Sequence, residues 1–118
     1  MLSRSQAERD FCYLTTRGRT SGLSRTIEIW FGARDSTIYM LSGGGDASNW
    51  VLNLKADPSV RIRIGRKEFE GSARVVTDHE EDRIARQLLA GKYQGWEPGK
   101  PLRAWARTSL PVAVDLRG

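Results

Sequence analysis

Near its N-terminus the chain reads Phe11-Cys12-Tyr13-Leu14-Thr15-Thr16-Arg17-Gly18-Arg19-Thr20-Ser21-Gly22-Leu23-Ser24-Arg25-Thr26-Ile27-Glu28-Ile29-Trp30-Phe31. Both ends of this stretch, residues 11–16 and 26–31, are rich in aromatic and β-branched residues, which predicts two strands. In the second strand apolar and other residues alternate, so we expect one buried and one open face. The basic segment between them, residues 17–25, is expected to form a turn that the rest of the chain supports.

This basic turn has the composition of an anion-binding loop. Its glycines permit positive φ, so successive backbone N–H groups can face one anion. Its hydroxyls can donate hydrogen bonds, and its guanidinium groups match the geometry of a phosphate. The residues expected to take part are Arg17, Gly18, Arg19, Thr20, Ser21, Gly22 and Arg25. The same composition is also typical of a plain hairpin turn, and both interpretations stay open.

The overall composition predicts one globular domain, residues 1–118, with a basic surface. Hydrophobic residues make up 39% and charged residues 28% of the 118 positions, which is typical of a globular chain. The net charge of +5 indicates an anionic partner: nucleic acid, a membrane surface or a phosphorylated small molecule. Because several arginines gather in one short turn, we favour a small anion.

The sequence also carries signals of cellular location. No apolar run is long enough to cross a membrane, and the first residues lack the apolar core of a signal peptide. Cys12 is the only cysteine, so no internal disulfide can form. We therefore expect a cytoplasmic protein without an integral membrane segment.

Two hairpins and a short helix are predicted after the basic turn. Residues 37–42 are expected to return against residues 26–31 as the first hairpin. A short helix follows over residues 48–55. Residues 60–64 and 68–76 alternate around a Gly-containing turn and form the second hairpin.

The C-terminal third predicts a longer helix and a last strand. Thr77 and Glu80 have capping-box spacing, which predicts a helix from there to about Tyr93. A helical turn is expected within residues 102–110, and residues 111–116 alternate as a strand. The fold class is therefore mainly β (α+β), with antiparallel strands closing into a small barrel.

Residues for metal or nucleophilic chemistry are scarce. His79 is the only histidine and falls in the first turn of a helix, and Cys12 lies in an apolar strand. No cluster of His, Cys and carboxylates has the spacing of a metal site. If the protein is an enzyme, we expect a bound cofactor to carry the chemistry.

Two further features point to a planar, phosphate-bearing ligand. The run Ser42, Gly43, Gly44, Gly45 leads into a helix N-terminus, an arrangement that binds anions but also serves as a flexible connector. Large rings are frequent and can wall a flat ligand: Trp30, Trp50, Tyr93, Trp96 and Trp105. Core packing is the simpler interpretation for Trp50, whereas Trp96 lies in a Gly/Pro loop and is the better pocket candidate.

At residues 14–25, 41–45, 49–58 and 105–112 the chain resembles the deazaflavin-dependent nitroreductase and quinone reductase family. The resemblance covers almost the whole chain. It implies a split β-barrel, with a short helix between hairpins and a longer helix before the last strand. It also implies an enzyme that binds reduced coenzyme F420 and passes a hydride to a small acceptor. Quinones, nitro compounds and activated alkenes are the acceptors of this family.

By position, the resemblance also implies roles for single residues. Arg19, Thr20, Ser21, Gly22 and Arg25 would contact the cofactor phosphate, and Thr26, Ile27 and Glu28 would lie along the ring. Ser42, Gly43, Gly44 and Gly45 would hold the phosphate side, and Trp50 and Asn53 would support the pocket. Tyr93 and Trp96 would form the substrate side, together with Trp30. The hydride would come from the cofactor, and no catalytic side chain is assigned.

Three departures from the family pattern keep alternatives open. Thr20 and Gly43 stand where family members often carry lysine, and Glu28 stands where many carry proline. FMN in a barrel of the pyridoxamine-phosphate-oxidase-like type is therefore the alternative cofactor. A homodimer, in which a second subunit covers the cofactor, is also allowed. The third hypothesis is a non-enzymatic basic barrel that binds nucleic acid, which is disfavoured because basic and aromatic residues do not interleave along one face.

Overall fold

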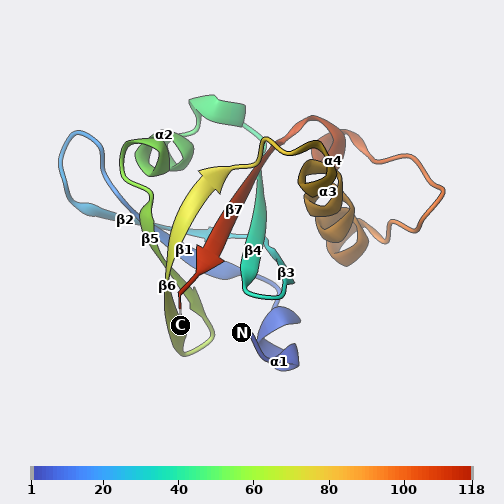
Figure 1. The fold of residues 1–118 in the computed structure, drawn as a ribbon, viewed down its shortest axis with the longest axis horizontal. Coiled ribbons are helices and arrows are strands. Elements are labelled where there is room, and N and C mark those ends of the chain that lie inside the picture. Colours follow the sequence, from blue (N-terminus) through green and yellow to red (C-terminus); the bar gives the residue numbers. More distant parts are fainter. Residues whose placement is uncertain (1, 118) are drawn as a thin grey trace.

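The computed structural model describes residues 2–117, in which one antiparallel sheet curls around an apolar core (Figure 1). The sheet has seven strands in the order β2-β1-β5-β6-β7-β4-β3. The strands are β1 Cys12–Arg17, β2 Ser24–Ile29, β3 Gly32–Arg34, β4 Thr37–Ser42, β5 Ser59–Ile64, β6 Lys67–Val75 and β7 Leu110–Leu116. The helices are α1 Arg4–Ala7, the 3-10 turn η1 Gly45–Ala47, α2 Asn49–Ala56, α3 His79–Gln94 and α4 Ala104–Thr108.

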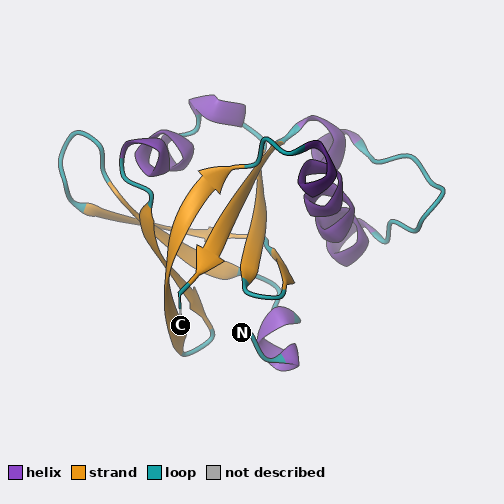
Figure 2. Cartoon of the chain, viewed as in Figure 1, coloured by secondary structure: helices purple, strands orange, loops and turns teal. Residues whose placement is uncertain are grey.

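The predicted fold class, a mainly β (α+β) split barrel, is confirmed. The short helix α2 lies between strand pairs, and the longer α3 precedes the last strand, as expected (Figure 2). Helix α2 lies at one end of the sheet, and α3 with α4 covers the other side (Figure 1). Among residues 2–117, no helix has both the length and the apolar character needed to span a bilayer.

Strand β4 shows how the alternating pattern builds two cores. Its residues Ile38 and Met40 are fully buried inside the curled sheet, with apolar residues of β1, β5 and β7. Its residues Tyr39 and Leu41 face the other way and pack with α3, where Leu89 is fully buried. A strand that is apolar on both faces is therefore covered by the barrel interior on one side and by a helix on the other.

The first predicted hairpin is wrong. Strand β2 pairs with β1 along its whole length, and it is the short β3 that pairs with β4. The break falls at Phe31, whose backbone N–H donates to the Tyr93 hydroxyl at 3.0 Å and whose carbonyl accepts from Lys92 Nζ at 2.9 Å. Helix α3 thus takes the Phe31 backbone groups that a continuous strand would have used in the ladder.

The predicted capping box at Thr77 and Glu80 is also wrong, although the helix it announces is present. Asp78 is the N-cap residue, and its carboxylate accepts a hydrogen bond from the Glu81 backbone N–H at 2.8 Å. Asp caps a helix as well as Thr does, so the start moves by one residue. The helix ends at Gly95, which has the left-handed conformation that glycine adopts without strain.

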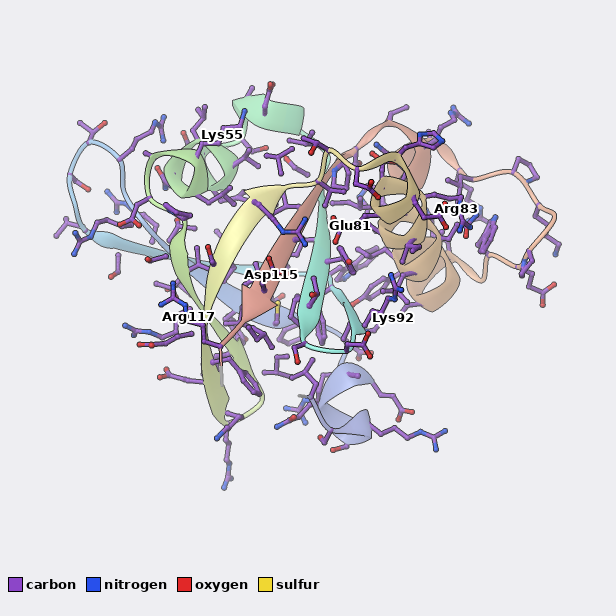
Figure 3. The ribbon with its side chains drawn as sticks, viewed as in Figure 1. Lys55, Glu81, Arg83, Lys92, Asp115 and Arg117 are labelled. Carbon is purple, nitrogen blue, oxygen red and sulfur yellow. The ribbon has the colours of Figure 1, made fainter. Side chains whose placement is uncertain are left out.

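Arg74 on β6 ties α3 to the sheet through the carboxylates of Glu81 and Asp115, which are both labelled in Figure 3. Its guanidinium donates to both oxygens of Glu81 on α3, at 2.6 and 2.8 Å, and to Asp115 on β7 at 2.8 Å. The hydroxyl of Tyr39 donates to the same Glu81 carboxylate at 2.7 Å. These hydrogen bonds lower the pKa of Glu81 from 4.5 to about 2, and Arg74 also lowers the pKa of Asp115.

We expect Glu81→Gln to destabilise the fold by about 1–2 kcal/mol at pH 7, since charge-assisted bonds are lost but Arg74 is partly exposed. A carboxyl group with a depressed folded pKa stabilises the protein above its unfolded pKa, and this contribution fades from about pH 5 towards pH 2. Urea unfolding across this pH range should show that the free energy of unfolding falls less steeply with decreasing pH in the variant than in the wild type. The control is Glu80→Gln, which removes an exposed pair with Arg83 and should change stability little. Equal pH slopes in the wild type and the Glu81 variant would contradict the assignment.

Candidate functional site

The basic turn and helix α2 enclose a cavity of about 1020 Å³, which we call the loop cavity. In Figure 1 the turn that joins β1 to β2 projects from the sheet next to α2. The lining residues are Thr16, Gly18, Arg19, Thr20, Ser21, Ser24, Arg25, Thr26, Ile27, Ser48, Asn49, Trp50 and Asn53. Two arginines are present and no carboxylate, so the lining carries a net positive charge.

Asn53 is the anchor of this cavity. Its side chain is buried, and its Oδ1 accepts hydrogen bonds from the backbone N–H of Arg19 at 3.2 Å and from Arg19 Nη1 at 2.8 Å. Its Nδ2 donates to Thr16 Oγ1 at 3.3 Å, and Asn49 accepts from the other arm of the guanidinium. Neutral amides therefore hold Arg19 in place without cancelling its charge.

The arginines of the basic turn keep their charge for an outside partner. Arg17, Arg19 and Arg25 take part in none of the ion pairs formed within residues 2–117. Arg19 and Arg25 line the loop cavity, whereas Arg17 lines a neighbouring cavity of about 390 Å³ together with Arg61 and Glu70. The geometry thus separates Arg17 from the other two.

The predicted turn conformation is present only in part, because Gly22 has a positive φ but Gly18 does not, and the N–H groups of both glycines bond within the turn instead of facing outward. The Gly22 N–H donates to the Gly18 carbonyl, and the Gly18 N–H donates to the Leu23 carbonyl, both at 2.8 Å. Gly22 has a φ of 74°, which a side chain would strain. Ser21 Oγ accepts from the Leu23 N–H, so its own hydroxyl hydrogen remains available to a ligand.

The second segment predicted to bind an anion, residues 42–45, does not line the loop cavity. Ser42 is buried, and its hydroxyl donates to the Gly45 carbonyl at 2.8 Å and lies 2.9 Å from Ser48 Oγ. Gly43 and Gly44 are exposed and leave only Ser48 of this region at the cavity wall. The segment therefore positions the N-terminus of α2, which has no acidic residue in its first turn.

Strand β2 offers an unpaired edge next to the loop cavity, since it is the outermost strand of the sheet. Hydrogen-bonded and non-bonded pairs alternate in an antiparallel ladder. The Gly18 N–H donates to the Leu23 carbonyl, so these two residues form a hydrogen-bonded pair. Counting along the register from this pair, Thr26 and Glu28 fall in pairs whose backbone groups are not hydrogen-bonded to β1. Their backbone N–H and C=O groups therefore face the open edge, where they are free to bind a flat polar ring.

Beyond this edge lies a second cavity of about 280 Å³, lined by Glu28, Ile29, Trp30, Leu41 and Trp105, which we call the aromatic pocket. Trp30 and Trp105 meet edge to face with ring centroids 5.4 Å apart. Tyr93 does not line the pocket; its ring stacks flat on Trp30 at 4.3 Å and supports it from behind. Trp30 remains 48% exposed, which leaves ring surface for a ligand.

The Tyr93 hydroxyl is committed to the backbone. It accepts from the Phe31 N–H and lies 2.7 Å from the Asp10 carbonyl, to which it can donate. Burial raises its pKa to about 12. Burial likewise raises the pKa of the Cys12 thiol to about 12, so neither group is suited to proton transfer or nucleophilic attack near neutral pH.

Trp96 lies apart from the other predicted aromatics. Its indole N–H donates to the Lys100 carbonyl at 2.7 Å, and it lines a small cavity with Gln94, Pro101 and Arg103. The structure does not bring it to Trp30. Sequence reasoning instead missed Trp105 as a lining residue, although it had noted the ring and the resemblance at residues 105–112 that contains it.

Arg86 explains how Trp105 is held. Its Nη1 lies 2.7–2.9 Å from the carbonyls of Ala106, Arg107 and Ser109, at the C-terminal end of α4. Asp82 accepts from Arg86 Nε at 2.6 Å and balances its charge. A cation at this end also suits the helix dipole. Helix α3 therefore supports both rings of the aromatic pocket, Trp105 through Arg86 and Trp30 through Tyr93.

Within residues 2–117, no group of three His, Cys, Asp or Glu side chains could hold a metal ion.

Comparisons with known proteins show the family of this chain. Residues 3–117 match the model of the F420H(2)-dependent quinone reductase family. The chain belongs to this family. It is 33% identical over 110 residues to the F420H(2)-dependent quinone reductase of Mycobacterium tuberculosis strain H37Rv, covering 86% of this chain and 68% of the relative. It is therefore an oxidoreductase, and coenzyme F420 is the cofactor of its family, so the FMN alternative is not needed.

Solved structures share the fold. A structure described as an F420-H2 dependent reductase superimposes with a TM-score of 0.67 at 23% identity, covering 90% of this chain and 94% of that one. One described as a domain-swapped dimer reaches 0.70 at 25% identity, covering 90% and 80%. A candidate 5-nitroimidazole antibiotic resistance protein of Bacteroides thetaiotaomicron reaches 0.74 at 17% identity, covering 100% and 82%.

Substitutions of Asn53 should distinguish the contribution of the loop cavity's shape to cofactor binding from the contribution of its charge. Asn53→Ala removes the anchor and should cost about 1–3 kcal/mol of stability, because the buried partner groups lose their hydrogen bonds. Asn53→Asp keeps the acceptor for Arg19 but neutralises its charge, so we expect at least tenfold weaker binding of reduced F420 even where the loop stays ordered. Thermal unfolding and cofactor titration check both. As a control, Asn49→Ala should shift stability by less than about 0.5 kcal/mol. Equal affinities of Asn53→Asp and the wild type would contradict a role for this charge.

Proposed function

We propose that this protein binds reduced coenzyme F420 between the basic turn and α2 and reduces quinones in the aromatic pocket. One observation carries the proposal. A cavity with two arginines and no carboxylate adjoins the open edge of β2, and the same strand continues to a pocket walled by Trp30 and Trp105. Along β2, the loop cavity would bind the phosphate of the cofactor, the open strand edge would bind its flat ring, and the aromatic pocket would bind the acceptor.

The residues of the loop cavity suit a phosphate-bearing ligand. Arg19 and Arg25 supply charged donors, Thr20 and Ser21 supply hydroxyls, and the N-terminus of α2 adds a positive dipole end. Arg19 is in place before binding, because Asn53 already holds it in position. The absence of lysine at residue 20 is thus offset by two arginines whose charges no carboxylate neutralises.

The ring of the cofactor would be oriented by the edge of β2. The backbone groups of Thr26 and Glu28 can pair with the polar side of a flat heterocycle, and Ile27 and Trp50 provide apolar surface. Reduced F420 held there would supply the hydride and the proton, the latter by way of solvent, that convert a quinone to a hydroquinone. No side chain is assigned as proton donor, since Tyr93 is bound to the backbone.

Quinones are the acceptors that the family description supports best. Nitro compounds and activated alkenes are a proposed wider range, because the aromatic pocket is open and walled by two indole rings. A homodimer that covers the open side of the cofactor and a cytoplasmic location both stay predictions.

One titration series tests the proposal. The purified protein is titrated with reduced F420, FMN and a single-stranded oligonucleotide, and a naphthoquinone is then added to the F420 complex. We expect binding of reduced F420 and its oxidation, recorded by absorbance, only when quinone is present. Tight FMN binding without F420 binding, or salt-sensitive oligonucleotide binding with neither flavin bound, would overturn the proposal.

Arg25 should be needed for affinity. Because it is a charged donor of the loop cavity, Arg25→Ala is expected to raise the Kd of reduced F420 about tenfold or more, the effect of one lost charge-assisted hydrogen bond. The matched control is Arg66→Ala in the turn between β5 and β6, outside the loop cavity, which should leave the Kd unchanged. If both substitutions weaken binding equally, net charge alone is responsible and Arg25 does not contact the phosphate.

A further inference from the structure

The two cavities along β2 carry opposite charges. The loop cavity is lined by Arg19 and Arg25 without a carboxylate, whereas the aromatic pocket is lined by Glu28 without any lysine or arginine. Glu28 follows Ile27 directly in the strand, so the sign of the charge changes within β2. An acceptor in the aromatic pocket would therefore meet a negative charge, whereas the phosphate end of the cofactor would meet positive ones.

The Glu28 carboxylate is oriented but not neutralised. The Tyr13 hydroxyl, on the neighbouring strand β1, donates to its Oε1 at 3.2 Å. Arg63 is turned to the Tyr13 ring, with its guanidinium carbon 4.2 Å from the ring centroid. Within residues 2–117 Glu28 takes part in no ion pair. Its negative charge thus remains available to a ligand in the pocket.

The rings beside Glu28 favour the same kind of ligand. Trp30 and Trp105 contact each other edge to face at 88°, and both rings line the pocket beside Glu28. The indole face attracts cations more strongly than the rings of phenylalanine or tyrosine do. Two tryptophans and one carboxylate together form a site suited to a cation.

We propose that the aromatic pocket selects acceptors by charge, favouring those with a positive group beside the reducible ring over neutral and anionic ones. This rests on the proposed function, because it takes the pocket as the acceptor site. Hydride transfer adds a negative charge to the acceptor, which the Glu28 carboxylate opposes in a neutral quinone. A cationic group on the same acceptor would bind the carboxylate and offset that repulsion. Because Glu28 is exposed to solvent, we expect a preference of about three- to fivefold, which salt weakens.

The kinetic test uses one naphthoquinone ring with three substituents: trimethylammoniomethyl, hydroxymethyl and carboxymethyl. In wild-type protein loaded with reduced F420, kcat/KM should fall in that order. Glu28→Gln should reduce the ratio of cationic to neutral kcat/KM about three- to fivefold. The control Glu68→Gln, on the solvent side of β6 and outside the pocket, should keep the wild-type ratio. A ratio that Glu28→Gln leaves unchanged would overturn the charge selection, whereas no reduction of any of the three quinones would refute the proposed function instead.

A binding test needs neither cofactor nor turnover. Protein without cofactor is titrated with benzyltrimethylammonium, benzyl alcohol and phenylacetate, and the indole N–H signals of Trp30 and Trp105 are followed by NMR after assignment with Trp→Phe variants. The ammonium ion should shift both signals at the lowest concentration and phenylacetate should not shift them. In Glu28→Gln the advantage of the ammonium ion over benzyl alcohol should shrink about three- to fivefold. Equal binding of the three probes to the wild type would overturn the proposal.

Discussion

The structure depends on how the backbone of Phe31 is bound. Its N–H and carbonyl are both engaged by α3, through the Tyr93 hydroxyl and Lys92 Nζ, and Lys92 also donates to the Ala7 carbonyl of the N-terminal segment. A backbone that bonds to a helix cannot continue a strand ladder, so the chain stops pairing after β2 and starts again at β3. The sheet is therefore open at β2, and that open edge adjoins both candidate binding cavities.

The same contact shapes the aromatic pocket. With its hydroxyl fixed to the backbone, Tyr93 presents a rigid ring on which Trp30 stacks. Arg86, two turns earlier on α3, fixes the end of α4 and with it Trp105. One helix thus supports two rings that come from segments far apart in the sequence. Tyr93 serves the pocket as a support and not as a proton donor, which agrees with its raised pKa.

A second feature of the structure is that charged side chains at the two cavities are held by uncharged partners. Elsewhere in the chain arginines meet carboxylates, as Arg74 and Arg86 do. In the loop cavity Arg19 is held by Asn53 and Asn49 instead, so it is ordered without being neutralised. At the other end of β2, Glu28 is held by a tyrosine hydroxyl with the same consequence. Hydrogen bonds to uncharged groups allow both charges to act on a ligand.

Local signals were enough to predict the strands other than the short β3, the two main helices and the presence of a turn at residues 17–25. Each of these signals depends on a few neighbouring residues, so it could be read from the sequence. Examples are the alternation at residues 26–31, the glycines at 18 and 22 and the helical spacing before Tyr93. The break after β2 could not be read, because it depends on α3, which binds Phe31 from more than sixty residues away. For the same reason Trp96 was expected beside the substrate and Trp105 was not: only the packing of α4 against α3 decides which ring faces Trp30. The sequence alone therefore predicted a phosphate-bearing ligand, from arginines, glycines and hydroxyls in one turn together with the family resemblance. The tertiary structure decided which of these groups share a cavity and keep their charge, because burial and hydrogen-bond partners arise only when distant segments meet.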